Sequence, residues 1–543
     1  MAGRLPFPQR LPGTYFDIES EVRQLAPPSD RGIVIDMMPL TWFNEGELVD
    51  IHSREWQSAF AITKLGVSAA MPESDDEFTR DTQRSLGALM ASGRIAGQSY
   101  GPTLGKIYPQ NTGGAKAQGT LEQEPLPQEE LDELEQAVTD AQQALNDAND
   151  ALASATEPAE LEAAQEVVAQ AEEALAAAQN TLSQGSESAT ITFVAKKSGA
   201  AGNSITVNVV RQEETYAITT FFNAQRMYAQ VITEKSQLPM ILRQNKLVGF
   251  EGDLDGRMPI GEVMLEGGDN GTVEDYATRL QSFLDVASAK TWHTISLAIA
   301  PEDEGYALAR IAFRSWLRQT NNDLQEERHS VAFGDFEDSN AGMDSDQIDV
   351  VFQDLEWASE FWLGKANVVR FFAGRSAGTP ANRSQTNDVI NNVTNIRPEL
   401  TIRQREAADA RGLFAIIGNW DGRFKIQRDS NSFVSVVPTK NIQWRDNRVK
   451  RGIHDWMTRV ARMNDTQHIG KTNNNEKGRE KMLGDANNLA LIMETENVLQ
   501  EHDISKLSIV ASDDSPTAVF VEARRFMFVS AIDTVDIFMT ITF

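Results

Sequence analysis

The chain has 543 residues, of which 50 are Lys or Arg and 79 are Asp or Glu, and it contains no cysteine. Its length predicts roughly three to four domains with sizeable cores, and its 41% apolar and 24% charged residues are typical of a globular protein. The net charge of −29 argues against a nucleic-acid partner. The lack of cysteine excludes disulfides and thiolate metal or catalytic sites. No apolar stretch predicts a membrane span or a signal peptide.

The first part of the chain predicts an arm followed by a folded body. Residues 1–30 are rich in proline and glycine, which indicates an extended arm. The run RGIVIDMMPL (31–40) predicts a buried strand. The segment from Ser74 predicts a helix with an acidic first turn and Gly93 near its end. We assign 31–117 to the N-terminal part of the body.

The next segment, 118–188, predicts an acidic, coiled-coil-like helical hairpin. Between Ala117 and Ala195 there is no Lys or Arg, whereas 17 residues are Asp or Glu. Apolar residues recur at alternating spacings of three and four, which favours two antiparallel helices of about 23 residues each. The predicted seam consists of Leu131, Leu134, Val138, Ala141, Leu145, Ala148 and Leu152, and of Leu161, Ala164, Val168, Ala171, Leu175, Ala178 and Leu182.

The turn between these helices has the sequence SATEP. Ser154 with Glu157 fits a capping box, and Pro158 suits the first turn of the second helix. Because an acidic pair of helices repels like chains, we expect a solvated projection. Two interpretations of this projection stay open. In one it is a spacer or surface decoration, and in the other it is a site for a specific receptor or partner.

The remainder of the chain predicts three further parts. Over 189–272, alternating apolar and polar residues separated by glycine turns predict a β-rich protruding domain. Over 273–425, helical and strand-like segments alternate through VVRFFAG, which predicts βαβ units and a largely parallel sheet. The last part, 426–543, predicts helices over Asn447–Met463 and Asn475–Leu499 and ends in a strand.

The chain closes with an alternating pattern in which Val535, Ile537, Met539, Ile541 and Phe543 share one face. Such a strand must pair with some sheet. It either closes its own domain or adds to the sheet of a neighbouring subunit.

Two motifs suggest catalysis, and each lacks a required part. GRSAG at Gly374–Gly378 has the G-x-S-x-G pattern of a hydrolase nucleophile around Ser376, and the strand-like VVRFF precedes it. Thr379–Asn382 interrupts the helix that should follow. GKT at Gly470–Thr472 resembles the end of a phosphate-binding loop, but Asp465 stands where that loop requires glycine.

Metal sites find no support in the sequence either. The acidic run Asp338–Asp349 lacks the glycine of a calcium loop. No two histidines are three or four residues apart, so we expect structural roles for them and neither a metal nor a cofactor. The six histidines are His52, His293, His329, His454, His468 and His502.

A series of unusual segments occurs in one order along the chain: Pro12–Ser20 followed by Arg31-Gly32, Ser198–Val210, Leu265–Thr272, Ala373–Asn387, Ile469–Arg479 and the closing IDTVDIFMTITF. In that order they resemble the tail sheath proteins of contractile-tailed bacteriophages and of related phage-tail-like bacteriocins. The resemblance accounts for both false catalytic motifs. The acidic hairpin is not part of the family's pattern, and we expect it on the outer surface of a particle.

The resemblance implies an α/β core with extended N- and C-terminal arms, and a structural protein that is not an enzyme. Subunits would form hexameric rings, stack helically around a tail tube and contract to drive the tube through a cell envelope. The implied partners are other copies, the tube protein, and baseplate and tail terminator proteins. The particle would be assembled in the host cytoplasm and the protein would belong to the virion tail. The implied inter-subunit arm residues are Gly13, Tyr15, Phe16, Ile18, Val535, Ile537, Phe538, Met539, Ile541 and Phe543.

One basic cluster, Arg445–Arg451, offers a further contact. Its cations either face an acidic surface on the tube or the next ring, or form a solvated helix face. Two other functions stay open at this point: a serine hydrolase that uses Ser376, and a non-contractile surface or adhesive protein of a particle. The cations of the cluster are Arg445, Arg448, Lys450 and Arg451.

Overall fold

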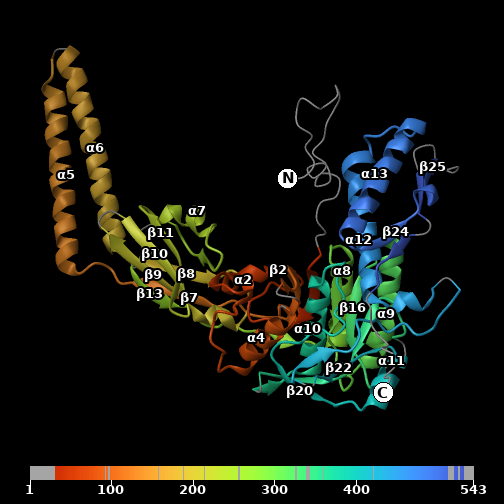
Figure 1. Ribbon diagram of the computed structural model, residues 1–543. Helices are drawn as coiled ribbons and strands as arrows, with labels where there is room; N and C mark the ends of the chain where they lie inside the picture. The colour runs from red at the N-terminus through yellow and green to blue at the C-terminus, as the bar shows by residue number, and fades with distance from the viewer. Residues whose placement is uncertain are drawn as a thin grey trace, which may run out of the picture.

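The computed structural model describes residues 31–91, 93–95, 98–156, 158–186, 189–212, 215–254, 257–324, 327–337, 343–358, 360–419, 421–438, 440–511, 519–523 and 526–530. The predicted arms lie outside these ranges. These are Gly13, Tyr15, Phe16 and Ile18 at one end and Val535, Ile537, Phe538, Met539, Ile541 and Phe543 at the other. The described chain forms an α/β body, a β-rich lobe that carries a projecting helical pair, and a C-terminal lobe (Figure 1).

The body is built on a seven-stranded sheet of order β2-β5-β1-β15-β16-β17-β21. All neighbours are parallel except β2, which is antiparallel to β5. The parallel sheet predicted from the helix–strand alternation is therefore present. Its strands come from both 31–117 and 273–425, so these two ranges share one core. The strands are β1 (Ile33–Met38), β2 (Val49–His52), β5 (Leu104–Pro109), β15 (Thr294–Leu297), β16 (His329–Phe333), β17 (Ile348–Val351) and β21 (Leu413–Phe414).

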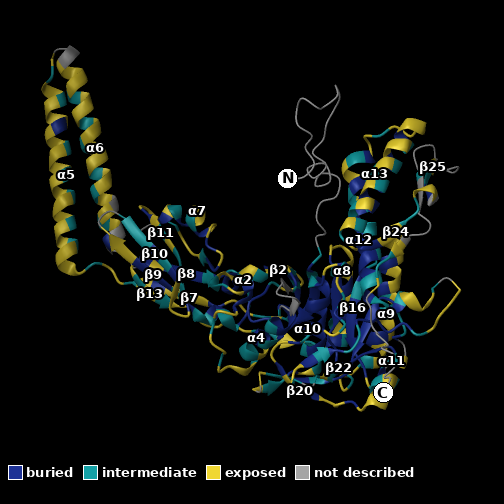
Figure 2. Ribbon diagram, in the orientation of Figure 1, coloured by how far each residue is buried: buried dark blue, intermediate teal, exposed yellow. Residues whose placement is uncertain are grey.

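Helices and short strands complete the body. Figure 2 shows that the interior around α10 and β16 is buried. Every residue of β15 and β17 is buried, as expected for parallel strands covered on both faces. The larger helices are α4 (Glu77–Leu89), α8 (Tyr276–Ser288), α9 (Tyr306–Leu324), α10 (Lys365–Gly378) and α11 (Ile402–Ala410). The short elements include α2 (Ser53–Trp56), α3 (Ile62–Leu65), β3 (Gly93–Ile95), β4 (Gln98–Tyr100), β18 (Asp354–Trp357), β19 (Phe361–Trp362), β20 (Val393–Arg397), β22 (Ile416–Gly418) and β23 (Phe424–Ile426).

The run VVRFF, which the sequence analysis takes for a strand, lies in the middle of α10. Every residue of α10 from Val368 to Ala377 is buried, because the helix is packed between the sheet and α4. A helix that is buried on all sides loses its amphipathic period, so a short apolar run cannot be distinguished from a buried strand. The strand prediction for this run is wrong for that reason.

The contact between α10 and α4 depends on glycine. A Cβ at Gly374 would lie 1.9 Å from the carbonyl oxygen of Leu89. We expect Gly374→Ala to lower the free energy of unfolding by about 2 kcal/mol or more, because backbone must move to admit the methyl group. Chemical unfolding followed by circular dichroism measures it. Gly87→Ala in α4, where nothing lies within 4 Å of the added Cβ, is the matched control. It should be neutral or stabilising by about 0.5–1 kcal/mol, and equal losses from both variants would contradict the packing argument.

The β-rich lobe is inserted between β6 (Asn111–Thr112) and β14 (Thr272–Val273), which pair with each other. It has a core of its own, which includes Phe193, Phe222 and Leu265. One sheet has the order β12-β8-β7 and the other the order β11-β10-β9-β13. The strands are β7 (Gln118–Gln123), β8 (Ala189–Ala195), β9 (Ile205–Gln212), β10 (Thr215–Phe222), β11 (Gln225–Ile232), β12 (Val248–Glu251) and β13 (Gly261–Met264), and a short helix is α7 (Leu238–Leu242).

The helical pair, α5 (Gln128–Ser154) and α6 (Pro158–Ser186), is inserted between β7 and β8 and extends away from the lobe (Figure 1). Both helices are longer than the expected 23 residues or so. At its base the amide of Leu126 donates to the carbonyl of Gly185 at 2.9 Å. The predicted seam residues are buried or half-buried, apart from Leu161, and the rest of the surface is exposed (Figure 2).

The structure describes only Ser154 of the two residues in the predicted capping box. Ser154 is the last residue of α5, and its hydroxyl donates to the carbonyl of Ala151 at 2.9 Å. Glu157 lies outside the described residues. Pro158 is the first residue of α6, where its missing N–H costs nothing.

The C-terminal lobe contains α12 (Asn447–Met463), which matches its predicted bounds, and α13 (Glu476–Thr495). Its strands form two antiparallel pairs, β24 with β27 and β25 with β26. Among the described helices, none combines the length and hydropathy of a membrane span. The strands are β24 (Leu499–His502), β25 (Leu507–Ala511), β26 (Val519–Ala523) and β27 (Phe526–Phe528).

Candidate functional site

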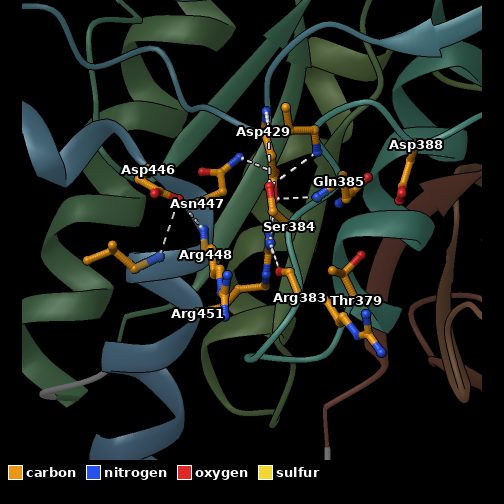
Figure 3. A network of polar contacts seen from close by, with 12 residues as sticks. Thr379, Arg383, Ser384, Gln385, Asp388, Asp429, Asp446, Asn447, Arg448 and Arg451 are labelled. Carbon is orange, nitrogen blue, oxygen red and sulfur yellow. Dashed lines mark hydrogen bonds and ion pairs between the residues drawn. The ribbon is translucent and has the colours of Figure 1, made fainter. Parts of the chain in front are cut away.

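Two segments that the sequence marked separately lie together where α12 begins. One is the basic run Arg445–Arg451, and the other is the loop 379–388 after α10. Figure 3 shows them on either side of Asp429, which belongs to the loop that follows β23. We call the polar side chains at this junction the α12 network. They are Asp346, Asp349, Asp409, Asp429, Arg445, Asn447, Lys450 and Arg451.

The buried face of α12 is polar. Along the helix, Asn447, Lys450, Arg451, His454, Asp455 and Arg459 are buried, whereas Val449, Ile453, Trp456, Met457 and Val460 are only half-buried. The buried polar residues recur at helical spacing, so one whole face of α12 is charged and faces the body. Charged groups stay buried only when they are paired.

Asp429 is the centre of the network. One of its oxygens accepts from the Arg451 guanidinium at 2.5 Å and from the amide of Gln385 at 2.9 Å, and the other accepts from Asn447 at 3.2 Å. Burial alone would raise the pKa of this carboxyl, but the charge of Arg451 and the donated hydrogen bonds hold it below its usual value. Asn447 also donates to Asp349, in β17, at 2.9 Å. Asp429 therefore joins the loop to α12, and Asn447 joins both to the sheet through Asp349.

Lys450 makes a second link between α12 and the body. Its ammonium group lies 2.5 Å from Glu327 and 2.8 Å from Asp346, and Lys440 lies 2.8 Å from the same aspartate. Burial would raise the pKa of Asp346, and the two lysines hold it below its usual value instead. Arg445 pairs in the same way with Asp409, at 3.0 Å.

These contacts correct one of the two interpretations of the basic cluster. Arg445, Lys450 and Arg451 are between 5% and 8% exposed, and their partners belong to the same chain. They do not form a solvated helix face, and the contact of the cluster with the tube or the next ring stays a prediction. The sequence did not reveal their acidic partners, which are spread over about a hundred positions and share no periodic pattern.

Arg448 is half-buried and points to the end of the described chain. Its guanidinium donates to the carbonyls of Asn497 and Ser530, each at 3.3 Å. The Ser530 hydroxyl donates to Asp446, whose other oxygen accepts from the amide of Arg448 at 2.8 Å and so caps α12. Ser530, which precedes residues 531–543, is thus hydrogen-bonded to the first turn of α12.

Two histidines lie farther along the same face. The rings of His293 and His454 are 5.3 Å apart and nearly perpendicular, and Nδ1 of His293 accepts from the amide of Ile33 at 3.1 Å. Burial, together with the nearby Arg31, lowers the pKa of His293 to about 3 and that of His454 well below 6.5. Both rings are therefore neutral in the folded chain.

Neutral buried histidines make the fold sensitive to acid. A folded-state pKa below that of the unfolded chain means that the unfolded state binds more protons, so the stabilisation is full above about pH 6.5 and falls as the pH decreases. We expect about 2 kcal/mol lost per histidine between pH 7.5 and 5, measured by chemical unfolding. His454→Gln should flatten this dependence. Equal slopes in the two proteins would contradict the assignment.

The hydrolase alternative is not supported by the geometry. Ser376 lies in the last turn of α10, without the strand and turn that precede a nucleophile, and it is 3% exposed. It lines a cavity with His329, which pairs with Asp349 at 2.9 Å. That cavity has a volume of about 10 Å³, which is room for one water molecule and not for a substrate.

The second motif, Gly470–Thr472, does not have the structure of a phosphate-binding loop. Gly470 has a φ of 73° in a turn that follows a π-helical segment, and Lys471 donates to the carbonyl of Thr466. The helix α13 begins several residues later, capped by the side chain of Asn475. Within the described ranges, no group of three or more His, Asp or Glu is arranged to hold a metal.

No protein-family profile matches the sequence, and no curated protein is similar to it. Two solved structures are similar over nearly the whole chain. A sheath tail protein from Listeria innocua superposes with a TM-score of 0.66 at 16% identity and covers 95% of this chain and 97% of its own. A sheath tail protein from Desulfitobacterium hafniense has a TM-score of 0.59 at 18% identity and covers 96% and 99%. The chain therefore has the mixed α/β fold of sheath tail proteins, as the sequence resemblance predicts.

Proposed function

We propose that this chain is the structural subunit of a contractile tail sheath. The observation that carries the proposal is the similarity of its fold, over 95% of the chain, to a sheath tail protein. The ordered series of sequence segments from Pro12 to Phe543 is a second and independent support. The subunits stack as hexameric rings around a tail tube, between a baseplate and a terminator, in a virion tail assembled in the host cytoplasm.

The arms give such a lattice its connections. Residues Gly13–Ser20 and Val535–Phe543 add strands to the sheets of neighbouring copies, where main-chain hydrogen bonds supply affinity and alternate side chains set the register. Head-to-tail contacts of this kind do not close within one ring and so generate a helix of rings. Contraction releases the free energy of a metastable extended state and needs no nucleotide.

The α12 network has a defined role in this proposal. Because Arg448 and Asp446 hold Ser530, the terminal arm starts from a point fixed to α12, and α12 is fixed to the sheet through Arg451 and Lys450. A pull on the arm is therefore transmitted to the body through buried ion pairs. Breaking one of these by removing a partner costs several kcal/mol, so the body moves as a unit.

The direct test is the state of assembly of the purified protein. We expect tubes or stacked rings by negative-stain microscopy, in a range of salt and protein concentrations. A protein that stays monomeric in every condition would contradict the proposal.

The helical pair separates this function from that of a non-contractile adhesive protein. Since α5 and α6 leave and enter the β-rich lobe at one point, deletion of Leu131–Leu182 should preserve assembly. We expect tubes of normal length from this variant, with a thinner outer profile in the micrographs. Loss of assembly on this deletion would instead assign the pair an essential contact.

A further inference from the structure

Two adjoining cavities form a groove along α4, on the side of the body near the β-rich lobe (Figure 1). Their volumes are about 520 and 410 Å³. They share Arg84, Phe361 and Leu363, and the Arg84 guanidinium lies 3.9 Å above the Phe361 ring at their junction. One wall is α4, and the other is the hairpin formed by β18 and β19. We call this feature the α4 groove.

The two ends of the α4 groove differ in chemistry. The smaller end is lined mainly by apolar side chains, among them Trp56, Met71 and Trp357. It also carries two exposed carboxylates, Glu360 and Glu73, and Glu73 pairs with Arg84 at 2.5 Å. The larger end opens beyond β1 and β15, at the point in the sheet where the chain connections change direction, which is where α/β proteins usually bind ligands. Its rim carries the exposed carboxylates of Asp81, Asp275, Asp303 and Glu304.

This chemistry suits a peptide that has an apolar residue followed by a basic one. An apolar and aromatic groove with most of its carboxylates at one end is the type of surface that accepts proline-rich segments, whose fixed φ lowers the entropy lost on binding. The chain has one such segment outside the described residues. Residues 4–12, RLPFPQRLP, contain Arg4, Phe7 and Arg10 among three prolines, whereas 531–543 contains no basic residue and no proline.

We propose that residues 4–12 of one copy dock in the α4 groove of a neighbouring copy, with Phe7 at the apolar end and Arg10 at the acidic end. This inference rests on the proposed function, which brings Gly13–Ser20 to a neighbouring copy and so carries the residues before it to that copy. Nine extended residues span about 30 Å, which is enough to reach across both cavities. This docking would give two neighbouring copies a lateral contact in addition to the strand that the arm adds to a neighbour's sheet.

The absence of cysteine allows a direct test. A chain with Gln9→Cys is mixed with a chain with Glu360→Cys, an exposed position that lines the apolar cavity. Under mild oxidation we expect a disulfide-linked dimer on a non-reducing gel. The matched control replaces Glu360→Cys by Leu308→Cys, which is 75% exposed on α9 and does not line the groove; this mixture should give no more dimer than either chain alone.

Charge reversal checks the orientation. In the Gln9→Cys chain, Arg10→Glu should reduce the dimer yield at least about fivefold, because the acidic rim then repels the segment, whereas Arg4→Glu, which lies beyond Phe7, should reduce it less. Micrographs of the same samples separate the two proposals. If the samples form tubes but no cross-link, the docking proposal is wrong and the sheath function stands. If they form neither tubes nor the cross-link, both proposals are wrong. A chain that carries both cysteines and forms the disulfide within itself would also overturn docking between copies.

Discussion

Removal of Val535–Phe543 is expected to yield subunits that fold but form no long tubes. The described cores of the body, the β-rich lobe and the C-terminal lobe are built from residues that precede this segment, the last being Phe528. The truncated chain should therefore keep its circular dichroism and its unfolding midpoint. It should lose the main-chain hydrogen bonds that the strand makes with a neighbouring copy, and sedimentation and negative-stain microscopy would show monomers or short rings.

Single substitutions within this strand sharpen the test. Met539 and Ile541 belong to the apolar face of the alternating pattern, and Thr540 belongs to the other face. Ile541→Asp should shorten the tubes severely, whereas Thr540→Asp, the matched control one residue away, should shorten them less. Normal tubes from the truncated chain would contradict strand exchange at this end. A truncated chain that unfolds would show that the strand closes its own subunit.

The second large effect is expected from Asp429→Asn. The change removes the charge that pairs with Arg451, which is 5% exposed and otherwise donates to the carbonyl of Arg383 at 2.7 Å. A buried cation left without its carboxylate costs about 3–5 kcal/mol. We expect the free energy of unfolding to fall by at least about 3 kcal/mol, measured by chemical denaturation at pH 7.5.

Glu302→Gln is the control for that measurement, because it makes the same carboxylate-to-amide change in the more exposed pair with Lys365. It should alter stability by less than about 1 kcal/mol. The double variant Asp429→Asn/Arg451→Gln leaves no unpaired charge and should be more stable than the sum of its single changes predicts. Strict additivity, or equal losses from the two single carboxylate variants, would mean that the ion pair is not a significant support of α12.

The sequence predicted those elements whose pattern is local. The alternation of helices and strands predicted the parallel sheet, and the spacing of apolar residues predicted the seam of α5 and α6. The predicted bounds of α12 are also those observed. These signals act within a few turns of one element, where periodicity is reliable.

The errors arose where burial reverses the usual pattern. The run VVRFF of α10 was taken for a strand because the helix is buried on every side and so shows no amphipathic period. The charged face of α12 was taken for a surface because solvation is the usual fate of such a face, whereas here Asp346 and Asp429 are brought to it by the fold. No local pattern showed that β1 and β5 join strands that follow almost two hundred residues later.

The way in which α5 and α6 are attached has a practical consequence. Because the chain enters the pair at Leu126 and returns at Gly185, and a hydrogen bond joins these two residues, the ends of any replacement unit would already be held together. An insertion with closely spaced ends costs little entropy beyond that of the original loop. Under the proposed function, with the pair on the outer surface of the particle, an antigen or a targeting domain grafted at this position would be displayed once on every copy.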